Sequence, residues 1–550
     1  MFNHPNKPRS KIAQEQRRYT LITCALMLLL AGCKASNPAE IKNRVDNNVY
    51  RTIDEKWKND FGVKANYRID GTNQSPNNVS TERTLPAGTI LTLPQAVAIA
   101  TDHNRVYQTE KENLYIKALD LRLARHQFDP ILFGSGEAEY VKARGGTASE
   151  ENASLGMQKL FATGASIGAN VTLSWIDVLS GDARGGLSRI LTVAATQPLL
   201  RGSDPNIVLE NLTQAERDLL YQVRTFNRYR KKFVVSIIAQ YYQVLQSYDQ
   251  LENSRHNYDV LVDVCGNAEK LAEAGRLPRF ELDQARQDKL VASDTVVKAE
   301  KIYKQTLDDF KLSLAVPTET EFGLDYNELA AMRNVKMTMP VFLEADAIDT
   351  AIALRLDLAN AFDAINDAER KILVALDSTR PDLRLVAAAN LKSKNTSDPV
   401  TLRTSRDSAA LGLQFDPQLD KVSLENDYRL SLITLDQSRR LYEEKIDTIV
   451  RDIREVYRDL AEATKRYKDQ TEQLFLAGRR FDNTMALLQY GRANTRDVLD
   501  AQRDLYRAQD AATTAMINYA VAMLRFYRDV EVLQVRPDGM WQTTISASSK

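Results

Sequence analysis

The stretch Ser203-Asp-Pro-Asn-Ile-Val-Leu-Glu-Asn-Leu212 opens the part of the chain that decides the fold, a helical run that extends to Ala274. Pro205 suits the first turn of a helix, where its missing N–H costs nothing, and Asp204 or Ser203 can cap that turn. Beyond it, apolar residues recur at alternating spacings of four and three, at Val234, Ile238, Tyr241, Leu245 and Tyr248. This seam predicts a coiled-coil helix, about 105 Å long for roughly 70 residues.

A second proline-free run, residues 419–490, has the same character, with apolar residues at Ile446, Ile449, Ile453, Val456, Leu460 and Ala463. The sequences that follow the two runs match: Gly275-Arg-Leu-Pro-Arg-Phe-Glu-Leu-Asp-Gln-Ala285 and Gly491-Arg-Ala-Asn-Thr-Arg-Asp-Val-Leu-Asp-Ala501. Upstream, Ala98-Ile-Ala100 pairs with Ala351-Ile-Ala353, and Pro130 pairs with Pro381. We infer an internal duplication.

Each half then contains a short helix, β segments, a long helix, a tight turn and another short helix. The four short helices are expected at 93–128, 278–315, 346–378 and 494–532. In each half, the two short helices together are about as long as the long one, so they can stack end to end beside it. This geometry favours one elongated barrel of helices. A dimeric structural coiled coil without a pore is the alternative.

The β segments alternate with a period of two. In 166–175, 383–391 and 409–415, apolar residues share one face. In the first and the last of these segments the opposite face is small and uncharged. Such strands suit the wall of a membrane barrel, although a soluble sandwich has a similar inner face. The polar stretches 145–152 and 393–405 are expected to be external loops. The first half offers four segments, at 131–142, 154–161, 165–176 and 188–197, with a tight turn at Thr163-Gly164. The second half offers two.

The N-terminus has the features of a lipoprotein signal peptide. Basic residues precede an apolar run at 21–30, which is too short to span a bilayer as a mature anchor. The run ends in Leu30-Ala31-Gly32-Cys33, which resembles the bacterial lipobox. That resemblance implies cleavage before Cys33, lipid attachment to it, and an outer-membrane address. An ordinary signal peptide with an accidental cysteine is the alternative.

The remaining composition excludes several classes of function. The 73 basic and 73 acidic residues balance, which argues against binding nucleic acid by bulk charge. After removal of the signal, Cys265 has no partner for a disulfide and is expected to be a small core residue. The four histidines are scattered, and no phosphate-binding glycine loop or catalytic constellation is visible. We therefore expect no enzyme, no cofactor and no metal site.

At this point the chain resembles the TolC family of outer-membrane efflux channels. The resemblance rests on Leu91-Thr-Leu-Pro-Gln-Ala96, Thr196-Gln-Pro-Leu-Leu-Arg-Gly202 and the two glycine turns, and covers residues 90–533. It implies a homotrimer with a β-barrel in the outer membrane and an α-helical tunnel in the periplasm. The expected divisions are a signal peptide at 1–32, a lipid-anchored leader at 33–90, repeats at 91–317 and 346–535, an equatorial linker at 318–345 and a tail at 536–550.

The resemblance also implies the function and its site. The chain would be the exit duct of a tripartite efflux or secretion system, with a periplasmic adaptor and an inner-membrane transporter as partners. Gly275, Leu277 and Gly491 fall on the periplasmic tip that docks the adaptor. Asp497 and Asp500 fall on the acidic pair that constricts the pore, and residues three apart share one helix face.

Three alternatives stay open. Asp497 and Asp500 can instead be the solvated start of a helix, where an acid complements the helix dipole. The family has two strands per half, so the chain contributes either four strands or six to the barrel. The rival function is a non-conducting structural coiled-coil lipoprotein of the outer membrane.

Overall fold

A computed structural model describes residues 37–57, 64, 67–69, 88–143, 146–180, 186–333, 343–393, 404–490, 492–536 and 541–543. The chain divides into two compact units, Met1–Glu55 and Lys56–Lys550. The described part of the first unit is helical: α2 (Pro38–Lys56) begins after Asn37, whose Oδ1 accepts a hydrogen bond from the backbone N of Ala39 at 3.1 Å. The predicted lipid-attachment residue, Cys33, and the second turn glycine, Gly491, lie outside the described residues.

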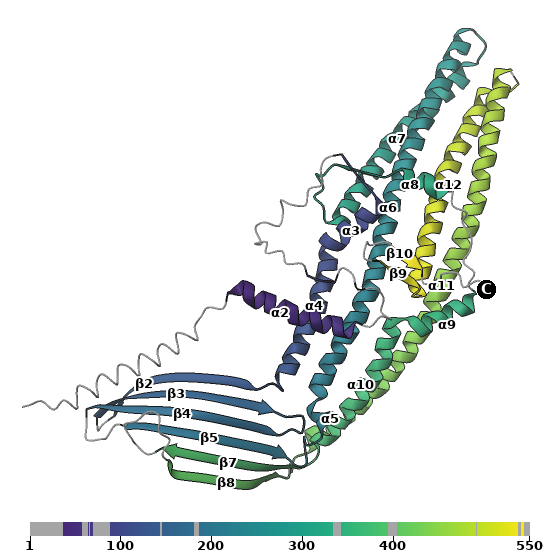
Figure 1. The fold of residues 1–550 in the computed structure, drawn as a ribbon. Helices are drawn as coiled ribbons and strands as arrows, with labels where there is room; N and C mark the ends of the chain where they lie inside the picture. Colours follow the sequence, from purple (N-terminus) through teal and green to yellow (C-terminus); the bar gives the residue numbers. More distant parts are fainter. Residues whose placement is uncertain are drawn as a thin grey trace, which may run out of the picture. The chain divides into compact units, whose positions relative to one another are not determined.

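The second unit has the predicted duplicated order of elements (Figure 1). The helices of the first repeat are α3 (Leu93–His103), α4 (Arg105–His126), α5 (Pro205–Val208), α6 (Glu210–Glu273) and α7 (Arg279–Leu314). Those of the second are α9 (Glu344–Leu354), α10 (Leu356–Ser378), α11 (Val422–Gln489) and α12 (Thr495–Asp529). The shorter helices pack along the long ones, α4 and α7 on α6 and α10 and α12 on α11. The mainly helical, duplicated fold class is thereby confirmed.

The predicted helix starts and seams are present. Thr92 and Gln95 form the expected capping box before α3, with Thr92 N donating to Gln95 Oε1 at 3.1 Å. Asp204 Oδ1 accepts a hydrogen bond from Asn206 N at 2.9 Å and so caps α5. Four of the predicted seam residues on α6 are fully buried, namely Val234, Ile238, Tyr241 and Leu245. The long helices have 64 and 68 residues, or about 100 Å each.

Two of the predicted short helices are interrupted. Residues 93–128 and 346–378 each hold two helices, separated by one extended residue, Asn104 in the first repeat and Arg355 in the second. Asn104 Oδ1 accepts from Tyr107 N at 3.0 Å and restarts the helix, while its Nδ2 donates to Ser313 O of α7 at 2.8 Å. Asn104 and Arg355 are separated by the same number of residues as Pro130 and Pro381. Ala98 and Ala351 are separated by more. The pairing of Ala98 with Ala351 is therefore out of register.

Both repeats contribute to one sheet of six strands in the order β2-β3-β4-β5-β7-β8. The strands are β2 (Ile131–Ala143), β3 (Gly146–Leu160), β4 (Ser166–Ser180), β5 (Gly186–Pro198), β7 (Asp382–Ser393) and β8 (Thr404–Asp416). All neighbours are antiparallel, including β5 and β7, which join the repeats. Of the two numbers left open, four and six, the sheet of one chain has six strands.

One predicted loop is a strand. Most of the segment 145–152 was expected to be an external loop, but it belongs to β3, which pairs with both β2 and β4. Its polar side chains do not prevent pairing, because the hydrogen bonds to the two neighbouring strands are made by backbone N–H and C=O groups. The tight turn at Thr163-Gly164 is confirmed, since Gly164 has a φ of +76° and its N donates to Phe161 O at 2.9 Å. Most of the other expected loop, 393–405, lies outside the described residues.

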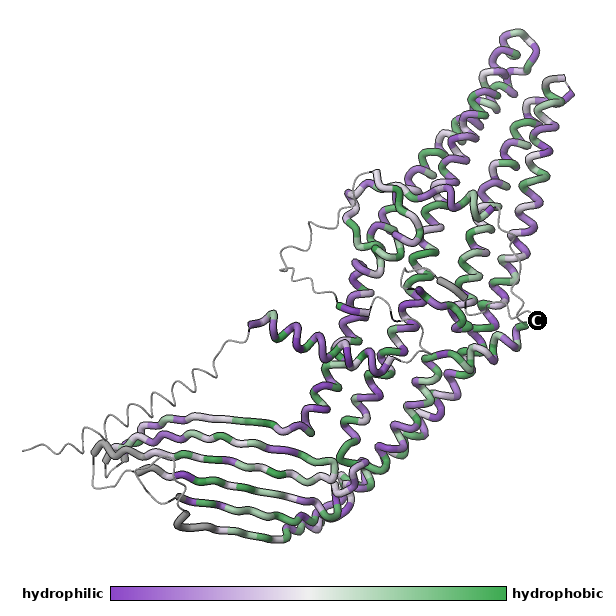
Figure 2. The backbone as a smooth tube through the Cα atoms, viewed as in Figure 1, coloured by the Kyte–Doolittle hydropathy of each residue, from purple (hydrophilic) through white to green (hydrophobic). Residues whose placement is uncertain are grey.

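The strand registers divide the side chains of the sheet between two faces, as the alternation predicts. Hydrophilic and hydrophobic residues both occur along the strands (Figure 2). The register places Leu155 opposite Val171 and Leu413 opposite Leu385 on one face. In the single chain the apolar side chains of this face are exposed, among them Leu155, Ile167, Val171, Leu173, Val193, Leu411 and Leu413. The other face includes the hydroxyls of Ser135 and Ser154, which lie 2.7 Å apart, and many small side chains, but it also carries Phe133. The apolar face of the sheet is therefore not covered by other parts of the single chain.

The largest apolar cluster surrounds the middle of α6. There β1 (Thr89–Leu91) pairs in parallel with β6 (Phe322–Leu324), which precedes α8 (Asn327–Arg333). Near the C-terminus, β9 (Leu533–Val535) pairs antiparallel with β10 (Trp541–Thr543). The hydroxyl of the buried Tyr241 donates to Leu91 O at 3.1 Å. Segments from both ends of the unit thus pack on one part of α6.

A group of charges lies beside this core, the equatorial charge cluster: Arg228, Lys231, Arg355, Asp357, Lys445 and Glu531. Lys231 Nζ donates to Glu531 Oε1 at 2.8 Å, and Arg228 Nη1 to Glu531 Oε2 at 3.1 Å. Arg228 also lies 3.2 Å from Asp357, which pairs in addition with Arg355 and Lys445. Glu531 has a φ of +70°, a conformation that costs energy without the constraint of its surroundings. The cluster connects α6, α10, α11 and the segment after α12.

Candidate functional site

The turn between α6 and α7 is a Schellman motif centred on Gly275. Arg276 N donates to Leu271 O at 2.8 Å, and Gly275 N donates to Ala272 O at 3.0 Å. Gly275 has a φ of +69°, the left-handed conformation that this helix ending requires and that glycine adopts without a Cβ penalty. The predicted role of Gly275 as the turn glycine is therefore explained by backbone geometry.

The turn between α11 and α12 repeats the same bond. Arg492 N donates to Leu487 O at 2.8 Å, which corresponds to the bond from Arg276 to Leu271. α12 then begins with a capping box, in which Asn494 N donates to Asp497 Oδ2 at 3.1 Å. The matching sequences after the two long helices thus share one helix-ending hydrogen bond.

An apolar cluster joins the four helices close to these turns. Its buried members are Leu261, Val264, Cys265 and Ala268 from α6, Ala285 and Ala292 from α7, and Val498 and Leu499 from α12. Leu277 in the first turn is half-buried against it, as are Met485 and Leu488 of α11. Cys265 is the small core residue that was expected. The cluster holds the two turns side by side, and we call this end of the unit the tip.

The predicted acidic pair begins α12. Asp497 is exposed and serves as the acceptor of the capping box, which matches the alternative of an ordinary helix start. Asp500 accepts a hydrogen bond from Arg503 Nη1 at 3.1 Å, and Arg503 Nη2 also lies 3.5 Å from Asp288 of α7. The carboxylates of Asp497 and Asp500 lie on the same side of α12, but that of Asp500 has a cationic neighbour, Arg503, within the same chain.

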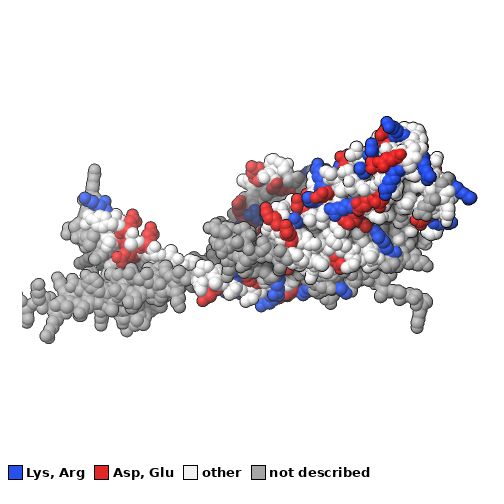
Figure 3. Space-filling view, turned by 90° about the horizontal axis from the view of Figure 1, so that it is seen from above, with Lys and Arg blue, Asp and Glu red and all other residues white. Residues whose placement is uncertain are grey.

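Sequence reasoning missed the arginines that accompany these acids. Besides Arg503, Arg480 of α11 donates to Asp504 Oδ2 at 2.6 Å. The spacing of three between Asp500 and Arg503 was a signal that could have been used, because such residues are neighbours on a helix. Over the helical part of the face seen in Figure 3, basic and acidic side chains alternate.

A second missed feature is a polar seam between α6 and α12. It consists of hydrogen bonds between Gln246 and Thr514, Asn253 and Asp510, and Asn257 and Gln502, at 2.9, 2.9 and 3.1 Å. Burial raises the pKa of Asp510, and the hydrogen bonds from Asn253 and Tyr506 oppose that rise. Polar residues at coiled-coil positions fix the register of two helices at a cost in stability. The two hairpins therefore meet here through polar contacts that specify their alignment.

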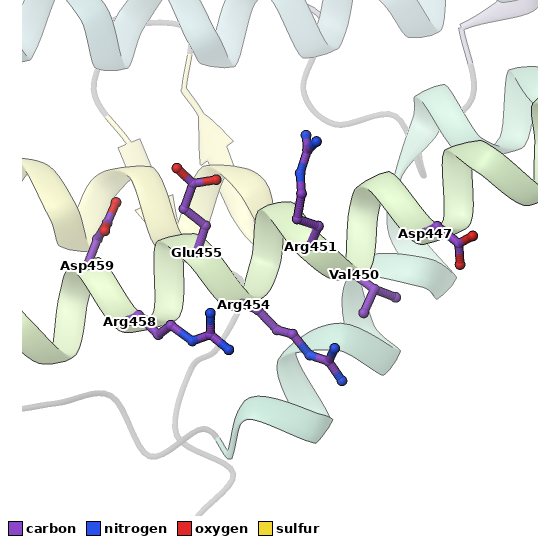
Figure 4. A pocket seen from close by; sticks show the side chains of 7 residues that line it. All are labelled: Asp447, Val450, Arg451, Arg454, Glu455, Arg458 and Asp459. Atoms are coloured by element: carbon purple, nitrogen blue, oxygen red, sulfur yellow. The ribbon is translucent and has the colours of Figure 1, made fainter.

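The hollow drawn in Figure 4 does not form a reaction site. Its lining residues, Asp447, Val450, Arg451, Arg454, Glu455, Arg458 and Asp459, all come from α11. Their side chains point in different directions rather than toward one point. Arg454 pairs with Glu344 at 3.3 Å and Arg451 with Asp452 at 2.7 Å. These arrangements are those of a solvated helix surface with ion pairs.

In the part of the chain that the structure describes, no group of three or more histidines, cysteines, aspartates or glutamates could hold a metal ion. Among the described helices, none is both long and apolar enough to cross a membrane. The tip therefore remains the candidate site: it combines the duplicated turns, exposed charges and the residues expected to dock an adaptor.

Comparisons with known proteins identify the fold. Neither a protein-family model nor a curated protein matches the sequence. Among solved structures, the chain is similar to CusC, with a TM-score of 0.59, 15% identity, and coverage of 84% of this chain and 99% of that one. It is similar to the outer-membrane channel OprN, with a TM-score of 0.58, 12% identity, and coverage of 85% of this chain and 98% of that one. For the outer membrane protein VceC of Vibrio cholerae the TM-score is 0.57, the identity 13%, and the coverage 80% of this chain and 95% of that one. The chain has the fold of these outer-membrane channels, and the resemblance seen in the sequence is confirmed at that level.

Proposed function

We propose that three copies of this chain form an exit duct in the outer membrane. The observation that carries the proposal is the six-stranded sheet with an exposed apolar face, in a chain with the fold of outer-membrane channels. Such a sheet leaves the outer edges of β2 and β8 unpaired, and in lipid every backbone group needs a partner. Pairing of these edges between copies would close one barrel, with its apolar face toward lipid and its polar face toward water.

The helices would continue this barrel as a tunnel in the periplasm. In this arrangement the duct receives substrates from an adaptor and an inner-membrane transporter of a tripartite efflux or secretion system. The tip, with Gly275, Leu277 and Gly491, would dock the adaptor. Asp497 and Asp500 would line the constriction of the pore at that end.

Two experiments test this function against the alternative of a non-conducting structural lipoprotein. The purified protein should conduct ions across a planar bilayer, because the proposed tunnel is continuous. Separately, single cysteines placed by Leu277→Cys or Ala493→Cys should cross-link to a periplasmic adaptor protein in intact cells. A silent bilayer would favour the structural alternative, and cross-links to surface proteins alone would reverse the proposed orientation.

The anchor of the duct would be the lipid on Cys33. The proposal rests on the basic and apolar leader that ends in Leu30-Ala31-Gly32-Cys33. Cells that express Cys33→Ser should lose incorporation of radioactive palmitate into this chain, whereas the trimer should still assemble because the barrel inserts by itself. Unchanged labelling of Cys33→Ser would show that this cysteine is not acylated. Cys265→Ser serves as the control, since Cys265 is buried in the apolar cluster at the tip and should not affect labelling.

A further inference from the structure

The strands of the sheet are staggered in one direction. We call the end of the sheet where the strands connect to α4, α5, α10 and α11 the helix end (Figure 1). One row of directly opposite residues crosses all six strands: Ile131, Gln158, Gly168, Ala194, Ala388 and Ala410. Ile131 is the first residue of β2 at the helix end, whereas Ala410 lies six residues before Asp416, where β8 returns to that end. The row therefore climbs by six residues over five steps between neighbouring strands.

This stagger corresponds to strands that are tilted relative to the axis of a barrel. A climb of about 1.2 residues per step, at about 3.3 Å per residue and about 4.8 Å between strands, gives a tilt of about 40°. Closed barrels have tilts of about 35–45°. The sheet of one chain thus already has the inclination that a closed barrel needs, and the number of strands then sets the width of that barrel.

Three such sheets would contribute eighteen strands to one barrel, since each chain has six. At this tilt and strand spacing, eighteen strands close at a diameter of about 36 Å between opposite backbones. Twelve strands, the number expected if each chain contributed four, would close at about 24 Å. The two additional strands per chain therefore increase the width by half.

The helices set the width of the tunnel that would continue this barrel. Each long helix is accompanied along its length by shorter ones, α6 by α4 and then α7, and α11 by α10 and then α12. Each chain thus presents four helices side by side, and three chains would form a ring of twelve. With about 8–10 Å between helix axes, such a ring has a diameter of about 31–39 Å. Eighteen strands match this diameter, and twelve would be narrower than the tunnel.

The side chains of the polar face leave this width open. Beyond β2, the row that starts at Ile131 and the next row on the same face consist of small or uncharged polar residues: Gln158, Gly168, Ala194, Ala388 and Ala410, then Gly156, Asn170, Thr192, Asn390 and Ser408. The aromatic ring of Phe133 lies over Gly156, where any side chain would collide with it. Gly156 thus gives the ring room against the wall of the sheet.

We propose that the outer-membrane part of the duct is a barrel of eighteen strands that admits hydrated, hydrophilic solutes about 20 Å across, such as polymer chains. The proposal rests on the proposed function, in which three copies close one barrel, and it adds the size and character of the solutes that this barrel passes. The additional pair of strands in the first repeat makes the barrel as wide as the helical tunnel, so the membrane segment does not narrow the path.

The test measures the opening in intact cells with thiol reagents of graded size. Thr192→Cys places a thiol on the polar face in the middle of β5, and Val193→Cys places one on the apolar face at the next position. Both proteins also carry Cys265→Ser, which removes the thiol at the tip. The reagents are a small maleimide and maleimides coupled to polyethylene glycol, with hydrodynamic diameters of about 18 Å and about 40 Å, chosen to lie below and above the expected opening.

Thr192→Cys should be labelled by the 18 Å reagent to within about twofold of the extent reached with the small maleimide, because a lumen of eighteen strands admits both. The 40 Å reagent should label it at least about tenfold less, since it exceeds the backbone diameter of the barrel. Val193→Cys should remain unlabelled by all three reagents, because a side chain on the apolar face would contact lipid.

The outcomes separate this inference from the proposed function. If Thr192→Cys reacts with the small maleimide but not with the 18 Å reagent, the wide barrel is refuted and the duct is not. If Val193→Cys reacts and Thr192→Cys does not, the polar face does not line a lumen and the proposed function itself fails. Electron cryomicroscopy of the purified protein in lipid nanodiscs counts the strands independently. Eighteen strands are expected, and a barrel of twelve would overturn the proposal.

Discussion

Replacing Glu531 with alanine should lower the free energy of unfolding of the second unit by about 3–5 kcal/mol, because it leaves the buried Lys231 without its carboxylate and Arg228 with Asp357 alone. The Glu531 side chain is 4% exposed, and those of Lys231 and Arg228 are 7% and 12% exposed. Both cations donate to its carboxylate, so the substitution removes two charge-assisted hydrogen bonds at once. Urea unfolding of the purified protein, followed by circular dichroism, measures the change.

Two further variants separate the causes of this loss. Glu462→Ala removes an exposed carboxylate that pairs with Arg466 at 3.4 Å, and it should have almost no effect because solvent screens such pairs. Glu531→Gly loses the same ion pairs as Glu531→Ala but relieves the left-handed backbone, so it should be less damaging by about 1 kcal/mol. If Glu531→Ala and Glu462→Ala unfold at the same urea concentration, the equatorial charge cluster does not stabilise the fold.

The cluster should also resist acid. Burial alone would raise the pKa of Asp357, but the hydrogen bonds from Arg355 and Lys445 and the charge of Arg228 lower it below the usual value. A carboxylate with a lowered pKa contributes stability that is complete above its unfolded value, about 4. That contribution is lost only as the pH falls through the lower, folded pKa. We therefore expect Asp357 to stabilise the protein throughout the neutral and mildly acidic range.

The long-range plan of the fold could be predicted because it depends on periodicity. The seam through Val234 and Ile238 and the duplicated turn sequences each repeat a local rule along the chain. The breaks at Asn104 and Arg355 could not be predicted in this way, because neither residue is proline or glycine. Asn104 leaves the helix through side-chain bonds to Tyr107 and to Ser313, and the second of these is a long-range contact.

The site was predictable to a similar degree. Gly275 follows from the rule that a long helix ends on a left-handed residue. The polar seam and the positive φ of Glu531 depend on which helices meet, and the sequence of one helix does not reveal its neighbour. Likewise, the acids of α12 were recognised, whereas Arg480 was not, because it reaches Asp504 from another helix.

Replacing both Asp497 and Asp500 with alanine should abolish most of the cation preference of the channel, the second large effect that we expect. In the proposed trimer, three copies of each carboxylate surround one axis, one helical turn apart, and such a ring attracts cations and repels anions. The double variant should show a reversal potential close to zero in a salt gradient and a higher conductance. Block by a trivalent cation should weaken by about tenfold or more.

The contacts at the start of α12 allow charge to be separated from helix capping. Asp497 accepts the hydrogen bond of Asn494 N, so Asp497→Ala removes a cap together with a charge. Asp497→Asn keeps an acceptor oxygen at the same place and removes the charge alone. If the ring sets selectivity, Asp497→Asn should shift the reversal potential as much as Asp497→Ala does. Arg503 neutralises Asp500 at 3.1 Å, so Arg503→Gln should make the channel more cation-selective. Planar-bilayer recordings with equal reversal potentials for all these proteins would show that the two acids only begin a helix.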